Sequence, residues 1–328
     1  MIHRRGLLAS AGAGLLAAAI PRPLRAAAAP VRLASVKYGS LSWVIETIRA
    51  LELDKQAGLT LQVIEVASNQ AGPVALLAGG ADVIVSDWTW AMRQRSLGEK
   101  LKFSAYSSSL GALVVNQASP ITSLAALEGK RVGVAGSAID KSWLLLRAYA
   151  RKTIGQDMAQ FVRPTFGAAP LLAEEIRSGR IDAVLNYWTY AARLTGSGFK
   201  EILSISDVMK DLGIEPVPAL VGFVWKEDYE ASHGSDVATL LKVMRQANEI
   251  LATDDAAWER LRPLVKPAND GEFKAIIAAY RAGIPKPWGT AEIAAAKKLM
   301  EVLVSTGDAE LMGHGTQFDA KLFHDAAS

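Results

Sequence analysis

One fifteen-residue pattern occurs twice in this chain, at residues 79–93 and again at residues 179–193. The identical positions are Gly79/Gly179, Asp82/Asp182, Trp88/Trp188, Thr89/Thr189, Ala91/Ala191 and Arg93/Arg193. Solenoid repeats are about 20–50 residues long, so an offset of 100 residues indicates two similar lobes instead. Each copy places aromatic residues just after an apolar run, at the end of a strand where α/β sheets bind ligands.

Apolar runs of strand length alternate with helical segments through both copies. The pattern predicts strands at 31–37, 59–66, 81–85, 103–106, 112–116, 131–135, 161–166 and 181–185, and helices at 43–54, 73–78, 88–96, 141–153 and 170–178. Strands separated by helices of this length form mostly parallel sheets flanked by helices. We therefore predict an α/β fold with lobe one at 29–110 and lobe two at 111–217. The apolar stretch 217–225 is expected to return the chain to lobe one, and residues 218–328 to cover that lobe with helices.

The first 28 residues have the composition of an export signal. Arg4-Arg5 precede a weakly apolar run from Leu7 to Ile20, and Ala26–Ala29 supply small residues for cleavage near Ala28. This pattern is typical of the twin-arginine route, with the general secretory route as the alternative. A membrane anchor needs about 20 apolar residues, and this run is shorter. The sequence therefore predicts a periplasmic protein.

Charge and cysteine content narrow the function classes. Segment 1–28 holds four arginines and no acidic residue, so its removal changes the formal net charge from +3 to −1. A chain with that charge has no basic footprint for nucleic acid. Cysteine is absent, which excludes disulfides, thiol nucleophiles and cysteine metal sites.

Loops that follow predicted strands supply the candidate ligand-binding residues. These residues are Tyr38, Ser40, Asn69, Gln70, Ser86, Asp87, Trp88, Ser137, Asn186, Tyr187 and Trp188. Asp82 and Asp182 precede buried strands instead, and we interpret them as structural turn residues.

Asp87 is the most specific of these candidates. A carboxylate beside Trp88 and Trp90 suits an amine or another cationic nitrogen, through charge pairing and cation–π attraction. The competing interpretation, which we favour, is a helix N-cap, a position that Asp fills well. Lys141 could meet an anion, although a solvated lysine in a first helical turn is more common.

The other candidates also have structural interpretations. Ser137 precedes a predicted helix, where its hydroxyl either caps backbone N–H groups or lies beside an anion bound by them. Asn69 and Gln70 allow the same two interpretations. Trp88 and Trp188 are expected to pack in the interior, with the same role in each lobe.

Several segments resemble the periplasmic substrate-binding proteins of ABC importers, in the nitrate, sulfonate, taurine and thiamine-precursor group. The resemblance lies in Val36–Ser40, Ala75–Val83, Ser123–Val134, Gly136-Ser137 and Ser178–Ala183, and it extends over essentially the whole chain. Ser86–Trp90 and Asp140–Trp143 differ from the sulfonate binders of the group, so the ligand class stays open.

The resemblance implies a type II periplasmic binding protein fold that closes on a small molecule and docks on a permease with its ATPase. It implies no cofactor, and we expect a monomer. A sulfonate or taurine-like zwitterion is the first expected ligand, with Ser137 at the anion and Asp87 at the amine. A nitrogen heterocycle stacked on Trp or Tyr is the second, and a metal or metal chelate the third.

An enzyme is the alternative class, since some proteins of this fold belong to thiamine-pyrimidine or menaquinone synthesis. Beyond the signal, the only histidines are His233, His314 and His324, and no nucleophile elbow, Walker loop or zinc spacing occurs. We therefore predict no catalytic residues and no bound metal.

Overall fold

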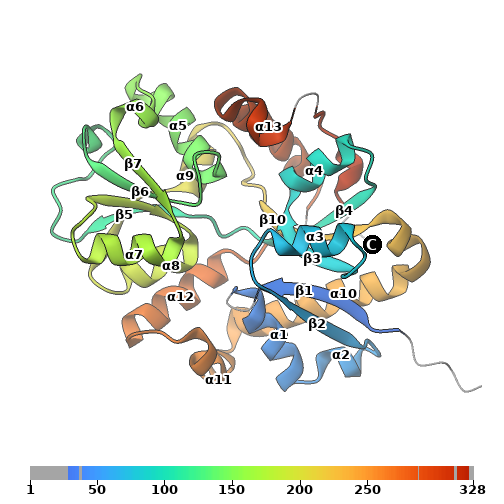
Figure 1. Cartoon of the computed structure of the whole chain (residues 1–328). Helices are drawn as coiled ribbons and strands as arrows, with labels where there is room; N and C mark the ends of the chain where they lie inside the picture. The colour runs from blue at the N-terminus through green and yellow to red at the C-terminus, as the bar shows by residue number, and fades with distance from the viewer. Residues whose placement is uncertain (1–28, 37–38, 287, 314–315, 325–328) are drawn as a thin grey trace, which may run out of the picture.

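The structure is a computed structural model that describes residues 29–36, 39–286, 288–313 and 316–324. The export signal predicted at residues 1–28 lies outside this range, as does Tyr38. Two five-stranded sheets form two lobes, which lie side by side in Figure 1. Among the described residues, no helix has both the length and the apolar character needed to cross a bilayer.

Lobe one is built on the sheet with strand order β2-β1-β3-β10-β4. Its strands are β1 (Val31–Val36), β2 (Leu61–Val66), β3 (Val83–Asp87), β4 (Leu101–Ser107) and β10 (Val221–Lys226). Its helices are α1 (Leu41–Ala50), α2 (Leu53–Gln56), α3 (Ala71–Leu77) and α4 (Trp88–Ser96). The predicted helix 43–54 is divided, because Glu52 takes a left-handed conformation between α1 and α2.

Lobe two repeats the arrangement with strand order β7-β6-β8-β5-β9. Its strands are β5 (Ala112–Asn116), β6 (Arg131–Ala135), β7 (Arg163–Gly167), β8 (Ala183–Asn186) and β9 (Phe199–Ser204). Its helices are α5 (Lys141–Ile154), α6 (Met158–Phe161), α7 (Ala169–Arg177), α8 (Trp188–Thr195) and α9 (Ile205–Asp211), with a 3₁₀ turn η1 at Ala125–Leu127.

The two sheets share one topology, as the internal repeat predicts. Four strands of each sheet run in one direction, and one strand, β10 or β5, is antiparallel to both of its neighbours. The prediction of mostly parallel sheets is confirmed, and so is the return of the chain to lobe one through β10. The lobe boundaries at residues 110 and 217 stay predictions.

The repeated aspartates have the same structural role in both lobes. Asp82 accepts hydrogen bonds from the backbone and side chain of Arg32, which ties β3 to β1. Asp182 does the same for Arg131 and ties β8 to β6. In both lobes the arginine also donates to the carbonyl of the repeated glycine, Gly79 or Gly179. Their interpretation as structural residues is therefore confirmed.

The C-terminal helices are α10 (Glu227–Thr253), α11 (Asp255–Val265), α12 (Asp270–Ala282) and α13 (Thr290–Met312), followed by a 3₁₀ turn η2 at Ala320–Leu322. Helices α10 and α11 pack on α1 of lobe one, as predicted. Helix α12 packs along α8 of lobe two, and α13 lies between α4 and α5 (Figure 1). The predicted packing on lobe one is therefore found, and α12 and α13 contact lobe two as well.

A partly buried aspartate outside the ligand region stabilises lobe two. Asp157 caps α6 through the Ala159 N–H and forms ion pairs with Arg147 and Arg151. The hydrogen bond from Arg147, against an opposing effect of burial, holds the pKa of Asp157 well below its usual value. We expect Asp157→Asn to lower the free energy of unfolding at pH 7 by about 1–3 kcal/mol.

The pH dependence of this loss follows from the sign of the shift. A depressed folded-state pKa contributes stability above the unfolded pKa, and that stability is lost as the pH falls through the folded pKa. Urea unfolding should therefore show the full difference at pH 7 and a shrinking one below about pH 4. The exposed carboxylate in Asp228→Asn is the control. A difference that stays constant down to pH 2 would contradict this account.

Candidate functional site

The two lobes meet where β3 of lobe one ends and α5 of lobe two begins. At this point, here called the interlobe junction, Lys141 Nζ lies 3.0 Å from Asp87 Oδ2. Each side chain keeps about 23% of its surface exposed. The carboxyl ends of strands from both sheets therefore meet around a pair of opposite charges.

Asp87 is both a helix cap and a charge partner. Its Oδ1 accepts from the Trp90 N–H at 2.8 Å and from the Thr89 hydroxyl, so the cap interpretation is confirmed. Burial by itself would raise the pKa of Asp87, but the charge of Lys141 and these hydrogen bonds hold it below the usual value. Lys141 is thus not the solvated lysine that the sequence favoured.

Tyr187, Asp140 and Gly136 form a second polar group in lobe two. The Tyr187 hydroxyl donates to Asp140 Oδ2 at 3.4 Å, and Asp140 Oδ1 accepts from the backbone N–H of Ser142. Burial raises the pKa of Asp140, and burial next to Asp140 raises that of Tyr187. A Cβ on Gly136, which has a φ of +97°, would lie 2.9 Å from the Tyr187 hydroxyl. Only glycine allows this approach.

The matched tryptophans have different environments. Trp88 is fully buried and packs edge-on against Phe318 and Phe323 in the core of lobe one. Trp188 is partly buried and reaches lobe one, where its ring centroid lies 6.0 Å from that of Trp43. Interior packing is confirmed for Trp88, but the expectation of equal roles is wrong. The two tryptophans begin α4 and α8, and different elements cover these helices. The 3₁₀ turn η2 and α13 pack on α4, whereas α12 packs on α8.

Ser40 lies on the lobe-one side of the junction, before α1. Its hydroxyl is 3.2 Å from that of Tyr106. A cavity of about 10 Å³ behind Tyr106 is lined also by Ser107, Asn248, Tyr280, Gly283 and Ile284. That volume suits about one water molecule. The side chains of β4, α10 and α12 therefore pack closely here. The lobes are apposed through the Asp87–Lys141 pair and the Trp43–Trp188 contact.

Asn69, Gln70, Ser86, Ser137 and Asn186 were predicted as site residues, but their side chains form no hydrogen bond with Asp87 or Lys141. Asn69 and Gln70 are exposed before α3, and no side-chain hydrogen bond from them or from Ser86 to a described residue is formed. Ser137 is exposed and does not cap α5, because Asp140 occupies the cap position. Asn186 is buried and binds the Ala169 carbonyl, so it anchors α7 to β8.

Helix N-termini supply further polar groups near the junction. The N-terminal N–H groups of α1, α3 and α8 receive no side-chain cap. Uncapped N–H groups and the positive end of the helix dipole attract anionic groups. By contrast, Asp87 and Asp140 cap α4 and α5 with negative charge.

Sequence reasoning missed three residues of this region. Tyr106 and Tyr280 lie within strand and helix patterns that indicate only burial. Asp140 was named only as part of the stretch Asp140–Trp143 that differs from the sulfonate binders. Within the described part of the chain, no three His, Cys, Asp or Glu side chains are grouped as a metal site would require.

Solved structures show which proteins share this fold. The alkanesulfonate-binding protein SsuA from Xanthomonas axonopodis pv. citri, bound to MOPS, has 15% identity and a TM-score of 0.69, covering 90% of this chain and 98% of that one. The aliphatic sulphonate-binding protein SsuA from Escherichia coli has 16% identity and a TM-score of 0.70, covering 90% of this chain and 92% of that one. The desulfurization enzyme DSZB has 14% identity and a TM-score of 0.60, covering 87% of this chain and 96% of that one.

The same fold thus carries binding proteins and an enzyme, and identities this low establish only the fold. No curated protein sequence matches the chain significantly. The sequence profile of the NMT1/THI5-like proteins, in contrast, matches residues 54–256, which is more than half of the chain. The protein therefore belongs to the NMT1/THI5-like family.

Proposed function

We propose that this protein is an exported, periplasmic solute-binding component of an ABC importer. Its two lobes close on a small zwitterion of the amino-sulfonate type, and the closed form is presented to a permease and its ATPase. The fold shared with the SsuA proteins supports the binding role. We further propose that the protein acts as a monomer without a cofactor.

The Asp87–Lys141 pair is the observation that carries the ligand class. A ligand with an amine and a sulfonate can replace the internal ion pair by two new ones, amine to Asp87 and sulfonate to Lys141. This exchange conserves charge pairing, whereas a simple anion would leave Asp87 without its partner. An unpaired, half-buried charge is costly, so the pair discriminates against ligands of one charge.

The anion contact is here assigned to Lys141 instead of Ser137. Ser137 is exposed and does not cap α5, whereas Lys141 already lies at the junction. The uncapped N-terminus of α1 or α8 would add backbone N–H donors to the sulfonate oxygens.

A nitrogen heterocycle is the second candidate ligand, and Tyr187 favours it. This ring is 39% exposed, and its hydroxyl contacts the Asp140 carboxylate. An aromatic face beside a carboxylate fits a flat ring that bears N–H donors.

The enzyme alternative has one observation in its favour, the fold shared with DSZB. Both described histidines lie on the α10 side of lobe one. His233 stacks on Tyr229, and His324 lies beside Glu230. Neither is paired with a nucleophile at the junction, which favours the binding role.

A thermal-shift panel tests the proposed function. It contains taurine as the zwitterion, ethanesulfonate as the anion, ethylamine as the cation and an aminopyrimidine as the heterocycle. A ligand present at about 1,000 times its Kd stabilises the folded protein by roughly 4 kcal/mol, which raises the Tm by several degrees. We expect taurine to give the largest rise.

The other outcomes are equally informative. A larger shift with ethanesulfonate than with taurine would refute the zwitterion assignment while keeping the binding role. A shift with the aminopyrimidine alone would select the second candidate. No shift in the panel, together with chemical turnover of any of its compounds, would establish an enzyme.

A further inference from the structure

Helix α12 is attached to both lobes. Its first half packs along α8 of lobe two. At its other end, the Tyr280 hydroxyl donates to Asn248 of α10 at 2.5 Å, and Arg281 donates to the Leu251 carbonyl. Just beyond the helix, the Gly283 carbonyl accepts from the Ser108 N–H in the segment that joins β4 to β5. The helix therefore spans the two lobes as a brace.

At the lobe-two end, α8 and α12 touch through their backbones. A Cβ on Gly196 would lie 2.6 Å from the Glu272 N and Cα atoms. A Cβ on Gly271 would lie 2.5 Å from the Gly196 carbonyl oxygen. No side chain fits between the helices here, so the contact allows little sliding.

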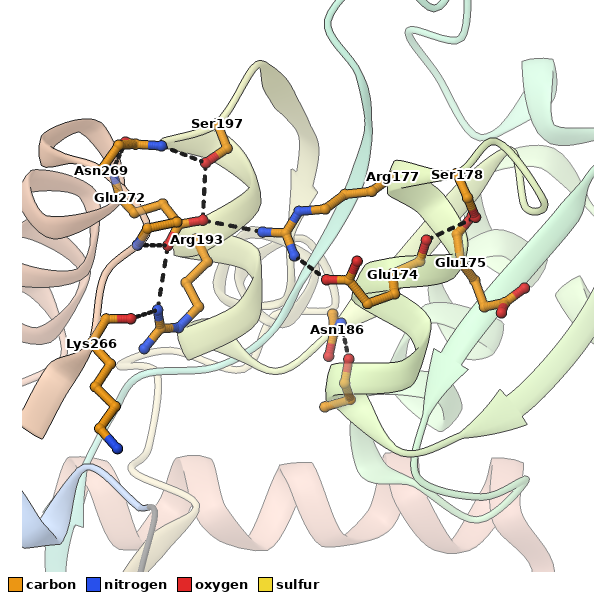
Figure 2. A network of polar contacts seen from close by, with 12 residues as sticks. Glu174, Glu175, Arg177, Ser178, Asn186, Arg193, Ser197, Lys266, Asn269 and Glu272 are labelled. Carbon is orange, nitrogen blue, oxygen red and sulfur yellow. Dashed lines mark hydrogen bonds and ion pairs between the residues drawn. The ribbon is translucent and has the colours of Figure 1, made fainter.

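A buried carboxylate holds this contact, here called the α8–α12 seam, in one geometry. The side chain of Glu272 is about 3% exposed and lies between Arg177 and Arg193 of lobe two. Figure 2 shows both guanidinium groups directed at this carboxylate. Oε1 accepts from Arg177 at 3.1 Å and from Ser197 at 3.0 Å. Oε2 accepts from Arg193 at 3.3 Å and from the Ala268 N–H at 2.9 Å.

Four donors fill the acceptor positions of one carboxylate. Three of them belong to lobe two, so Glu272 is a central point at which α12 is bound to that lobe. Losing one partner of such a buried group leaves charge uncompensated, which is strongly unfavourable. A seam that has lost only part of these contacts is therefore unfavourable, and we expect α8 and α12 to be either fully in contact or apart.

The seam also borders a hollow that is open to solvent. A hollow of about 310 Å³ is lined by Arg177, Arg193, Ser197, Lys266, Ala268 and Glu272. Arg177 and Arg193 keep 31% and 22% of their side-chain surfaces exposed. Water therefore reaches these charges, and they hydrate when α12 leaves α8.

We propose that Glu272 is a remote positioning residue that locks the lobes in the apposed arrangement. Rotation of lobe two away from lobe one that separates α8 from α10 must break either the seam or the α10 end of α12, in addition to the Asp87–Lys141 pair and the contacts of α13. By holding the seam, Glu272 sets the ratio of closed to open protein and thereby how often the junction is accessible to ligand. This inference depends on the two-lobe fold and not on the proposed ligand.

The ratio is measured as a distance between the lobes. The chain contains no cysteine, so Val74→Cys on α3 and Leu171→Cys on α7 accept a pair of spin labels specifically. Both positions are exposed, at 67% and 56%. In the ligand-free protein we expect Glu272→Gln to raise the ratio of open to closed molecules by about tenfold or more. The longer inter-label distance reports the open form.

Asp270→Asn is the matched control, because it makes the same charge change two residues away in the first turn of the same helix. Asp270 is 78% exposed and pairs with Arg262 of α11, so its loss should leave the distance unchanged. Circular dichroism checks the fold of each variant. If Glu272→Gln does not fold, Ser197→Ala removes one donor and keeps both charges, with a smaller shift expected in the same direction.

The proposal is overturned by an unchanged distance in folded Glu272→Gln. It is equally overturned by an unchanged distance in Ser197→Ala when Glu272→Gln does not fold. An equal shift in Asp270→Asn would show a general charge effect on α12 and would also overturn it. Failure of every ligand in the thermal-shift panel has no bearing on these distances, so the two proposals fail separately.

Discussion

Trp258→Ala is expected to lower the free energy of unfolding by about 3–5 kcal/mol, because it removes a fully buried tryptophan from the cluster of aromatic rings at which the lobes meet. Trp258 is fully buried on α11. Its ring packs edge-on against Trp43 and Tyr280, and its indole N–H donates to the Leu251 carbonyl at 2.8 Å. Truncation leaves a cavity and removes one of the two donors to that carbonyl, which Arg281 also contacts. The two surrounding rings come from separate helices, α1 and α12, that cannot collapse together.

Differential scanning calorimetry measures this effect as a fall in Tm of about 10 °C, at roughly 2–4 °C per kcal/mol for a chain of this size. Trp258→Phe is the control. It keeps most of the ring volume and loses the hydrogen bond, so a loss of about 1–2 kcal/mol is expected. Equal losses in the two variants would show that packing volume at this position does not matter, contrary to the structure.

The strands and topology of each lobe were predictable from the sequence. The contacts that hold the two lobes together were not. Alternating apolar runs gave the strands and the repeated topology because each strand pattern is local. Strand β9, with the sequence Phe199–Ser204, was missed because two charged residues interrupt it. The apolar face of α12 indicates that one side is buried, but the pattern carries no information about which lobe covers it.

The same limit applies to the candidate site. The cap at Asp87 was predicted because an N-cap depends on residues within one turn. Its partner Lys141 lies 54 positions away in the chain, and only the folded lobes bring the two charges together. The Trp88/Trp188 pair shows that the same residue at the same position of a repeat can have different neighbours, which the repeat does not predict. Their surroundings come from Phe318 and Phe323 in one lobe and from Trp43 and Tyr280 in the other.

A double-mutant cycle on Asp87 and Lys141 is expected to separate the structural part of this ion pair from ligand recognition. Asp87→Asn keeps a good N-cap for α4 and removes the charge. Lys141→Met keeps an unbranched side chain and removes the other charge. Each single change should cost about 1–3 kcal/mol of stability by leaving its half-buried partner unpaired. The double variant should cost less than the sum, since neither charge remains.

Ligand binding should respond differently, because both charges are needed for a zwitterion. Isothermal titration should show taurine affinity reduced by about 10–100-fold in each single variant, which corresponds to roughly 1.4–2.8 kcal/mol. The double variant should regain part of the stability that the two single changes lose, but it should not regain affinity for taurine. Since Lys141 and the cap hydrogen bonds hold the pKa of Asp87 below its usual value, affinity should stay constant between pH 8 and pH 5. If affinity returned with stability in the double variant, the ion pair would be purely structural, and the ligand would have to bind through the helix N-termini instead.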